Sequence, residues 1–141
     1  METTAAIVLA AGQGKRMESK VRKQFLLLNG KPLITYSLKA FEESRVDRIV
    51  LVTGEDEIPY CRKEIVEKYG FSKVTAVIAG GRERYHSVYE GLKAAGDAEY
   101  VLIHDGARPL LTEKIIDRAI KGAKEYGACA AGMPVKDTIK F

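Results

Sequence analysis

The segment HDGARP, residues 104–109, holds residue types that could bind a nucleotide through a metal ion. A carboxylate at the end of a buried strand, such as Asp105, is a natural ligand for Mg²⁺ on nucleotide phosphates. Arg108 follows three residues later, and its guanidinium could hold a phosphate through two parallel hydrogen bonds. In the alternative, Asp105 and Arg108 form a salt bridge with each other. His104 should point to the other side of its strand, where we expect it to pack or to support the site from behind.

The segment LAAGQGKRM, residues 9–17, is a second candidate for phosphate binding. Gly12 and Gly14 allow the backbone to turn so that successive N–H groups can surround phosphate oxygens, and Lys15 and Arg16 add positive charge. The glycine spacing does not match a Walker A loop, and Met17 stands where the dinucleotide-binding fingerprint requires a small residue. A plain tight turn is the alternative interpretation.

Lys23 lies in the basic stretch 20–25, a short distance after the glycine turn. It could fold back over a bound triphosphate as a fixed positive charge. Spacing alone favours a solvated surface lysine, because runs of charge usually face water.

The segment AGGRERYHSV, residues 79–88, combines close backbone approach at Gly80 and Gly81 with donors around a helix start, namely Arg82, Arg84 and Ser87. In the alternative, the two arginines pair with Glu83 or Glu90. His86 has no partner at metal-ligand spacing, so we expect a structural role for it.

Alternating strands and helices are expected to position these segments. Apolar runs rich in β-branched residues predict strands at Thr4–Leu9, Arg48–Thr53, Lys73–Ile78, Tyr100–Ile103 and Ala128–Val135. Helical spacing predicts helices at Leu33–Phe41, Ile58–Tyr69, Tyr85–Ala95 and Glu113–Tyr126. This order predicts an α/β fold with a mainly parallel sheet and helices on both faces. Ligands of such sheets bind beyond the carboxyl ends of the strands, where all the candidate segments should meet.

Composition indicates one soluble globular domain over residues 1–141, because 46% of the residues are hydrophobic and 30% are charged. The opening residues lack the pattern of a secretory signal or a membrane span, so we expect a cytoplasmic protein with no membrane partner. Cys61 and Cys129 have neither metal-ligand spacing nor the density of a disulfide framework, and we assign them no chemistry. The net charge of +4 is mild and clusters beside the glycine turn, which favours a small polyanionic ligand over nucleic acid.

With these segments in this order, the sequence resembles the methylerythritol phosphate cytidylyltransferases, which belong to the nucleotidyltransferases built on a Rossmann-like sheet. The resemblance spans essentially the whole chain and rests on AAGQGKRM, the KQF that follows, GGRERYHSV, HDGARP and PVKDT. It implies transfer of CMP from CTP to 2-C-methyl-D-erythritol 4-phosphate, a polyol phosphate, with release of pyrophosphate and no covalent intermediate. The family acts in non-mevalonate isoprenoid precursor synthesis.

The resemblance also implies a role for each matching residue. The residues that would hold the cytidine are Ala10, Ala11, Gly12, Gly81 and Ser87. The triphosphate would be cradled by Gly14, Lys15 and Arg16, and Gly106 would complete the nucleotide-binding set. Lys23 and Arg16 would be catalytic and stabilise charge on the α-phosphate, which raises Lys23 above the surface interpretation. Asp105 would help to place Mg²⁺ or another divalent cation, and the methylerythritol phosphate would lie toward Arg108 and Thr138.

Some features depart from the family pattern. Arg22 replaces the proline that usually precedes the Lys-Gln pair, and Arg82 stands where aspartate is often found. The final residues, 138–141, resemble the start of a strand, so we expect the domain to be incomplete at its C-terminus. The family continues with an arm that pairs subunits, which implies a homodimer for the full-length protein.

Several other functions are alternatives to this one. A ribitol-5-phosphate cytidylyltransferase is disfavoured by AAG in the first loop and by HDGARP. A sugar-1-phosphate nucleotidyltransferase usually has a longer first loop that is richer in glycine. A non-catalytic nucleotide-binding or subunit-pairing fragment stays open. A dehydrogenase is disfavoured because the third glycine of its fingerprint is missing.

Overall fold

The computed structural model describes residues 3–10, 27–106, 111–126 and 129–130. At its centre lies a five-stranded sheet in the order β5-β4-β1-β6-β7, in which every adjacent pair of strands is parallel. The strands are β1 (Thr4–Leu9), β4 (Arg48–Thr53), β5 (Val74–Ala79), β6 (Tyr100–Asp105) and β7 (Cys129–Ala130). All six residues of β1 are buried, which explains why Ala5 to Leu9 form one apolar run and do not alternate with polar residues.

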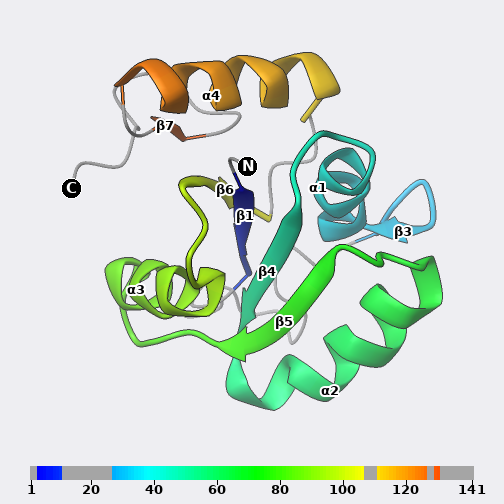
Figure 1. Ribbon diagram of the computed structural model, residues 1–141. Coiled ribbons are helices and arrows are strands. Elements are labelled where there is room, and N and C mark those ends of the chain that lie inside the picture. The colour runs from blue at the N-terminus through cyan, green and yellow to red at the C-terminus, as the bar shows by residue number, and fades with distance from the viewer. Residues whose placement is uncertain (1–2, 11–26, 107–110, 127–128, 131–141) are drawn as a thin grey trace.

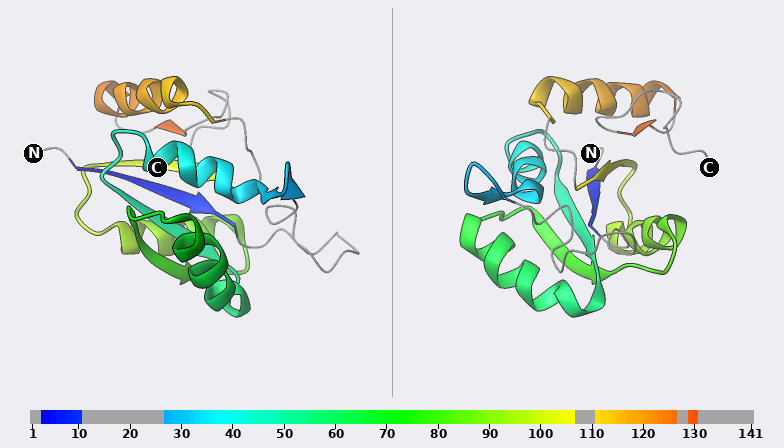
Figure 2. Two further views of the ribbon diagram at one scale, coloured as in Figure 1. Left: turned by 90° about the vertical axis from the view of Figure 1, so that its right-hand side faces the viewer. Right: turned by 180° about the vertical axis from the view of Figure 1, so that it is seen from behind.

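Helices cover both faces of the sheet, as predicted (Figure 1). One face packs against α1 (Leu33–Glu42), α4 (Glu113–Tyr126) and the helix formed by α2 (Ile58–Tyr60) with η3 (Cys61–Glu67). The other face packs against α3 (Arg84–Ala95). In Figure 1, α3 lies to the left of the sheet and α1 and α2 lie to its right; Figure 2 gives two further views of these layers.

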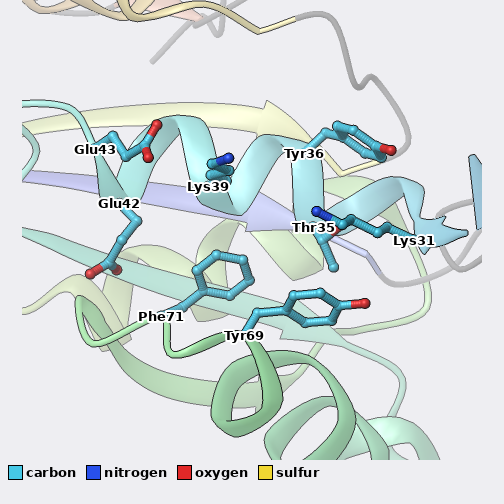
Figure 3. Close-up of a pocket in the computed structure, with 8 residues that line it drawn as sticks. All are labelled: Lys31, Thr35, Tyr36, Lys39, Glu42, Glu43, Tyr69 and Phe71. Atoms are coloured by element: carbon cyan, nitrogen blue, oxygen red, sulfur yellow. The ribbon is translucent and has the colours of Figure 1, made fainter. Parts of the chain in front are cut away.

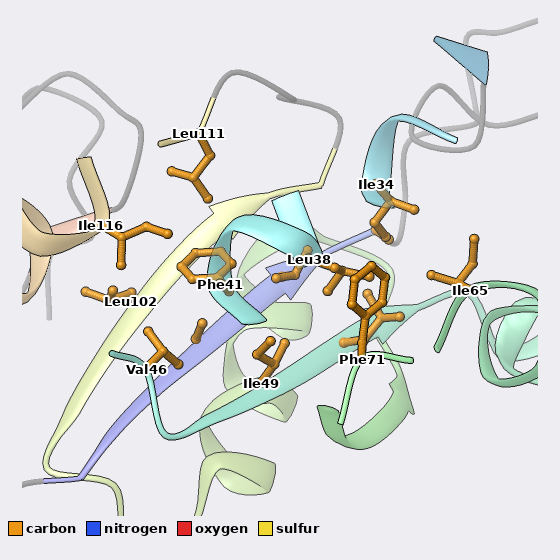
Figure 4. Packing of buried hydrophobic residues seen from close by; sticks show 14 of the residues in the cluster. Ile34, Leu38, Phe41, Val46, Ile49, Ile65, Phe71, Leu102, Leu111 and Ile116 are labelled. Carbon is orange, nitrogen blue, oxygen red and sulfur yellow. The ribbon is translucent and has the colours of Figure 1, made fainter. Parts of the chain in front are cut away.

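Successive residues of β1 contribute to opposite cores, as the period of a strand requires. Ala6 and Val8 belong to the cluster under α1, and Ile7 and Leu9 belong to the cluster under α3. Figure 4 shows the first cluster, in which side chains from α1, α4 and the strands interdigitate, including Leu38, Phe41, Ile49, Leu102 and Ile116. The sheet is therefore held from both sides, and its strand ends are fixed in register.

The predicted elements agree closely with the structure. Thr4–Leu9, Arg48–Thr53 and Glu113–Tyr126 have the predicted bounds, and the strand predicted at Lys73–Ile78 begins and ends one residue later. The strand predicted at Tyr100–Ile103 continues through Asp105. Of the strand predicted at Ala128–Val135, Cys129–Ala130 is observed as β7, and its other residues lie outside the described ones. Within the helix predicted at Ile58–Tyr69, Cys61–Glu67 is a π-helix.

One element was not predicted, a hairpin formed by β2 (Leu27–Leu28) and β3 (Lys31–Pro32). Its turn has positive φ at Asn29 (53°) and at Gly30 (80°), the conformation that Asn-Gly favours in two-residue hairpins. The hydroxyl of Tyr36 donates to the carbonyl oxygen of Leu28 and fastens the hairpin to α1. The Asn-Gly pair was the sequence signal for this turn.

Candidate functional site

The strand order reverses between β1 and β6, and the ends of these two strands lie side by side. From β1 the chain proceeds to β4 and β5 on one side and then returns to β6 on the other. Leu9 is the register partner of Asp105, so the first residues beyond β1 and the last residue of β6 share one edge. This is where open α/β sheets bind their ligands.

Backbone hydrogen bonds fix this edge. The amide of Ala10 donates to the carbonyl oxygen of Val52 at 2.6 Å. The amide of Gly106 donates to the carbonyl oxygen of Leu9 at 2.8 Å. A Cβ atom at Gly106 would lie 3.1 Å from the oxygen of Leu9 and 3.3 Å from Cγ1 of Ile34, which is tighter than ordinary contact. Glycine at 106 therefore lets β6 leave the sheet close to the end of β1.

Asp105 is half-buried at this edge as the last residue of β6. The strand carries it to the position that the sequence predicted for a metal-binding carboxylate. Its neighbour His104 points into the core under α1, as predicted, and is only 1% exposed. Nε2 of His104 lies 3.0 Å from Oγ of the buried Ser37, and its ring meets the ring of Phe41 edge-on at 5.8 Å. A buried polar contact thus joins α1 to the residue directly before Asp105.

Gly81 and Ser87 are brought together at the start of α3. The amide of Gly81 donates to Oγ of Ser87 at 3.2 Å, and Ser87 is only 3% exposed. Because the hydroxyl accepts this bond, its own proton remains available as a donor. A Cβ atom at Gly81 would lie 2.2 Å from Cβ of His86, so the turn requires glycine. The amide of Gly80 also donates to the carbonyl oxygen of Thr53 at 2.8 Å, which ties this turn to the end of β4.

The two arginines of this turn are exposed. Among the described residues, neither Arg82 nor Arg84 forms an ion pair, and Glu90 pairs instead with Lys93 at 3.1 Å. The alternative in which these arginines pair with Glu83 or Glu90 is therefore wrong. Their positive charge, together with the positive end of the α3 dipole, makes this corner attractive to anions.

His86 has the structural role that we expected. Its Nδ1 accepts a hydrogen bond from the amide of Glu83 at 3.3 Å, and its ring lies 4.2 Å from the ring of Tyr85. These contacts define the first turn of α3.

Cys61 is buried and has no features of a reactive thiol. Burial raises the pKa of the Cys61 thiol to about 11, and the bond from its Sγ to Oγ1 of Thr53 at 3.7 Å only partly opposes this effect. The thiol is therefore neutral at physiological pH and a poor nucleophile.

The other predicted site residues lie outside the described ones. They are Ala11, Gly12, Gly14, Lys15, Arg16, Lys23, Arg108 and Thr138. The structure thus brings Ala10, Asp105 and Gly106 to one edge, and Gly81 and Ser87 to each other. In the described part of the chain, no helix is both long and apolar enough to cross a lipid bilayer.

An open parallel sheet that reverses its strand order beside a carboxylate and close-packed glycines defines this chain as a Rossmann-like nucleotidyltransferase fold. The family model of the 2-C-methyl-D-erythritol 4-phosphate cytidylyltransferases matches residues 4–141. The chain belongs to this family.

Relatives that carry the name of this family support the assignment. The protein of Clostridium kluyveri is 51% identical over 142 residues, which cover 100% of this chain and 62% of the relative. The protein of Lachnoclostridium phytofermentans is 55% identical over 141 residues, which cover 100% of this chain and 60% of that relative. The chain therefore spans about 60% of the length of these curated relatives.

Solved structures show the same fold. The 4-diphosphocytidyl-2C-methyl-D-erythritol synthase of Anaerococcus prevotii matches with a TM-score of 0.76 and 29% identity, over 99% of this chain and 59% of that one. The 2-C-methyl-D-erythritol 4-phosphate cytidylyltransferase of Thermus thermophilus matches with a TM-score of 0.65 and 27% identity, over 100% and 59%.

Proposed function

We propose that this chain is the nucleotide-binding domain of an enzyme that transfers CMP from CTP to 2-C-methyl-D-erythritol 4-phosphate. The observation that carries the proposal is the meeting of Ala10 with Asp105 and Gly106 at the sheet reversal, in a chain of this family. The enzyme would act in the cytoplasm in isoprenoid precursor synthesis, and the full-length protein would be a homodimer. Residues 1–141 would form a single nucleotidyltransferase domain that the rest of the full-length protein completes.

In this reaction, a phosphate oxygen of the methylerythritol phosphate attacks the α-phosphorus of CTP. The bond from the α-phosphorus to the oxygen that bridges it to the β-phosphorus breaks, and pyrophosphate leaves with that electron pair. Such a transfer needs little covalent chemistry from the protein and depends on positioned charge. We assign charge stabilisation at the α-phosphate to Lys23 and Arg16, and the cradle of the triphosphate to Gly14, Lys15 and Arg16.

The cytidine is assigned to the backbone of Ala10, Ala11, Gly12 and Gly81, and to Ser87. The buried Ser87 supports this assignment, because its hydroxyl already accepts a bond from Gly81 and can donate its proton to a carbonyl oxygen of a base. Gly106, which follows β6 beside the end of β1, is also assigned to the nucleotide-binding set. Arg108 and Thr138 are assigned to the second substrate.

Asp105 is assigned to a divalent cation, Mg²⁺ or another. Within the described ranges, no group of three or more His, Cys, Asp or Glu residues could hold a metal by itself. A strand-end carboxylate nevertheless fits Mg²⁺, which proteins usually bind through one or two carboxylates together with substrate phosphates. When bound, the ion would neutralise phosphate charge.

The first test is calorimetric titration of this chain with CTP and Mg²⁺, beside ATP and GTP. We expect binding selective for CTP, weakened at least about tenfold in Asp105→Asn. Asp97→Asn is the matched control, because it makes the same change at an exposed carboxylate in the loop before β6. Binding of no nucleotide, or equal binding of all three, would contradict the proposal.

The second test follows product formation by ³¹P NMR after addition of 2-C-methyl-D-erythritol 4-phosphate or ribitol 5-phosphate. Turnover of the first alone supports the proposed substrate, and turnover of the second alone would assign the chain to the ribitol enzymes. CTP binding without turnover would restrict this chain to the nucleotide-binding half of the reaction.

A further inference from the structure

A pocket of about 330 Å³ lies between the outer face of α1 and the turn that follows η3 (Figure 3). Its lining comes from β3, α1 and residues 69–71, and it includes none of the residues assigned to CTP or to the second substrate. Its volume is within the range of small-molecule sites, about 300–1,000 Å³. The pocket is therefore large enough for a ligand of its own.

One wall of the pocket is aromatic. The rings of Tyr69 and Phe71 are stacked, with centroids 6.0 Å apart and planes inclined by 16°. Phe71 is only 5% exposed and packs in the core under α1, so it holds this wall in place. A planar ring that enters the pocket can stack against such a wall.

Two lysines line the pocket, Lys31 from β3 and Lys39 from α1. Lys31 and Lys39 are exposed, and in the described part of the chain neither ammonium group forms an ion pair or a hydrogen bond. The carboxylate of Glu42 is already engaged, because Oε2 accepts from Oγ of Ser72 at 2.6 Å and Oε1 accepts from the amide of Lys73 at 2.9 Å. In Figure 3 the side chain of Glu42 points away from Lys31.

Glu43 is then the one lining acid without such bonds in the described part of the chain, and in Figure 3 Lys39 lies between Glu43 and Lys31. Ammonium groups beside an aromatic wall match a ligand that has a planar ring at one end and an anionic group at the other.

We propose that this pocket binds a small aromatic anion, a planar ring that carries a phosphate or a group of similar charge. A nucleoside monophosphate belongs to this class. The ring stacks on Tyr69 and the anionic group lies between Lys31 and Lys39. The proposal does not depend on the chain being a cytidylyltransferase.

The probe is 1-naphthyl phosphate, titrated into ¹⁵N-labelled chain and followed by NMR. We expect saturable shifts at the amides of Lys39, Tyr69 and Phe71, with a dissociation constant below about 1 mM. Inorganic phosphate and uncharged 1-naphthalenemethanol should each bind much more weakly, because the first has no ring and the second has no anionic group.

Variants separate the contributions of charge and ring. The double change Lys31→Gln and Lys39→Gln should weaken binding at least about fivefold. Lys63→Gln, which removes one exposed charge from η3, is the matched control and should leave the affinity unchanged. Tyr69→Leu keeps an apolar side chain without the ring and should also weaken binding, with the melting temperature measured to confirm folding.

Absence of saturable shifts at these amides would overturn the proposal. It would also be overturned by equal affinity in the double variant, or by shifts centred on Ala10, Gly81 and Ser87, which would place the probe at the carboxyl edge of the sheet.

Discussion

The two ends of the sheet differ in how their polar groups are used. At the amino end, the amide of Thr4 donates to Oδ2 of Asp47 at 2.8 Å, and Arg48 donates to Asp97 at 3.0 Å. The amides of Glu99 and Tyr100 both donate to the carbonyl oxygen of Thr3. At the carboxyl end, the half-buried Asp105 and the close-packed Gly106 lie at the sheet reversal. The turn after β5 holds the close-packed Gly81 and two exposed arginines that form no ion pair among the described residues.

This difference separates stability from ligand binding. Charged groups at the amino end are paired with the fold itself, so their loss should affect stability alone. At the carboxyl end, Arg82 and Arg84 form no ion pair among the described residues, and the glycines are required by close approach. Changes there should alter nucleotide binding more than the amino-end changes do. Four substitutions test this contrast, from the largest expected effect to the smallest.

Gly81→Ala should have the largest effect. Its new Cβ would overlap Cβ of His86, which cannot rotate away, so the turn must move and should cost about 1–3 kcal/mol of stability. CTP affinity, measured by calorimetry, should fall at least about tenfold because Ser87 loses its position. Gly91→Ala is the control: it also meets a packed neighbour, Cγ2 of Ile7 at 2.6 Å, but away from the edge. An equal loss of affinity in both variants would contradict a specific role for Gly81.

Ser37→Ala should lower the free energy of unfolding by about 1–3 kcal/mol, because it removes a buried partner of His104. Urea denaturation measures this loss. Metal-dependent CTP binding should weaken by less than in Asp105→Asn, since only the support behind Asp105 changes. A variant as stable as the parent chain would show that the Ser37–His104 contact is not needed.

Asp47→Ala should cost about 0.5–1.5 kcal/mol, because the buried amide of Thr4 loses its acceptor. Thermal melting measures the change. CTP affinity should equal that of the unchanged chain, and a clear loss would break the separation of the two ends.

Asp97→Asn should have the smallest effect, because the Asp97 side chain is 94% exposed. The hydrogen bond from Arg48 holds the pKa of the Asp97 carboxyl below its usual range. Its contribution to stability is therefore present above the usual carboxyl pKa and is lost as pH falls through the lowered value. Melting curves from neutral to acidic pH should show a small difference from the parent chain that disappears at low pH. A difference that grows toward low pH would contradict this sign.

The sheet and its helices could be predicted because apolar runs and helical periods are visible within each segment of the sequence. Thr4–Leu9 is a β-branched threonine followed by an apolar run, and Glu113–Tyr126 has a helical period, so both elements could be predicted. The π-helical bonding of Cys61–Glu67 leaves no mark in hydrophobic spacing, and the β2–β3 strands are too short to show a period.

Contacts between distant residues could not be predicted in this way. Ser37 and His104 are 67 residues apart, and only the packing of α1 on β6 brings them together. The approach of Gly81 to His86 likewise depends on the turn geometry, whereas the edge position of Asp105 followed from strand order alone.

The central place of β1 has a consequence for how the chain is made. β1 leaves the ribosome before both of its partners, β4 and β6, so Thr4 must wait for its register partner Tyr100. At about 5–20 residues per second, that wait is on the order of 5–20 s. During synthesis, this fully buried strand therefore has one edge without its partner until β6 emerges.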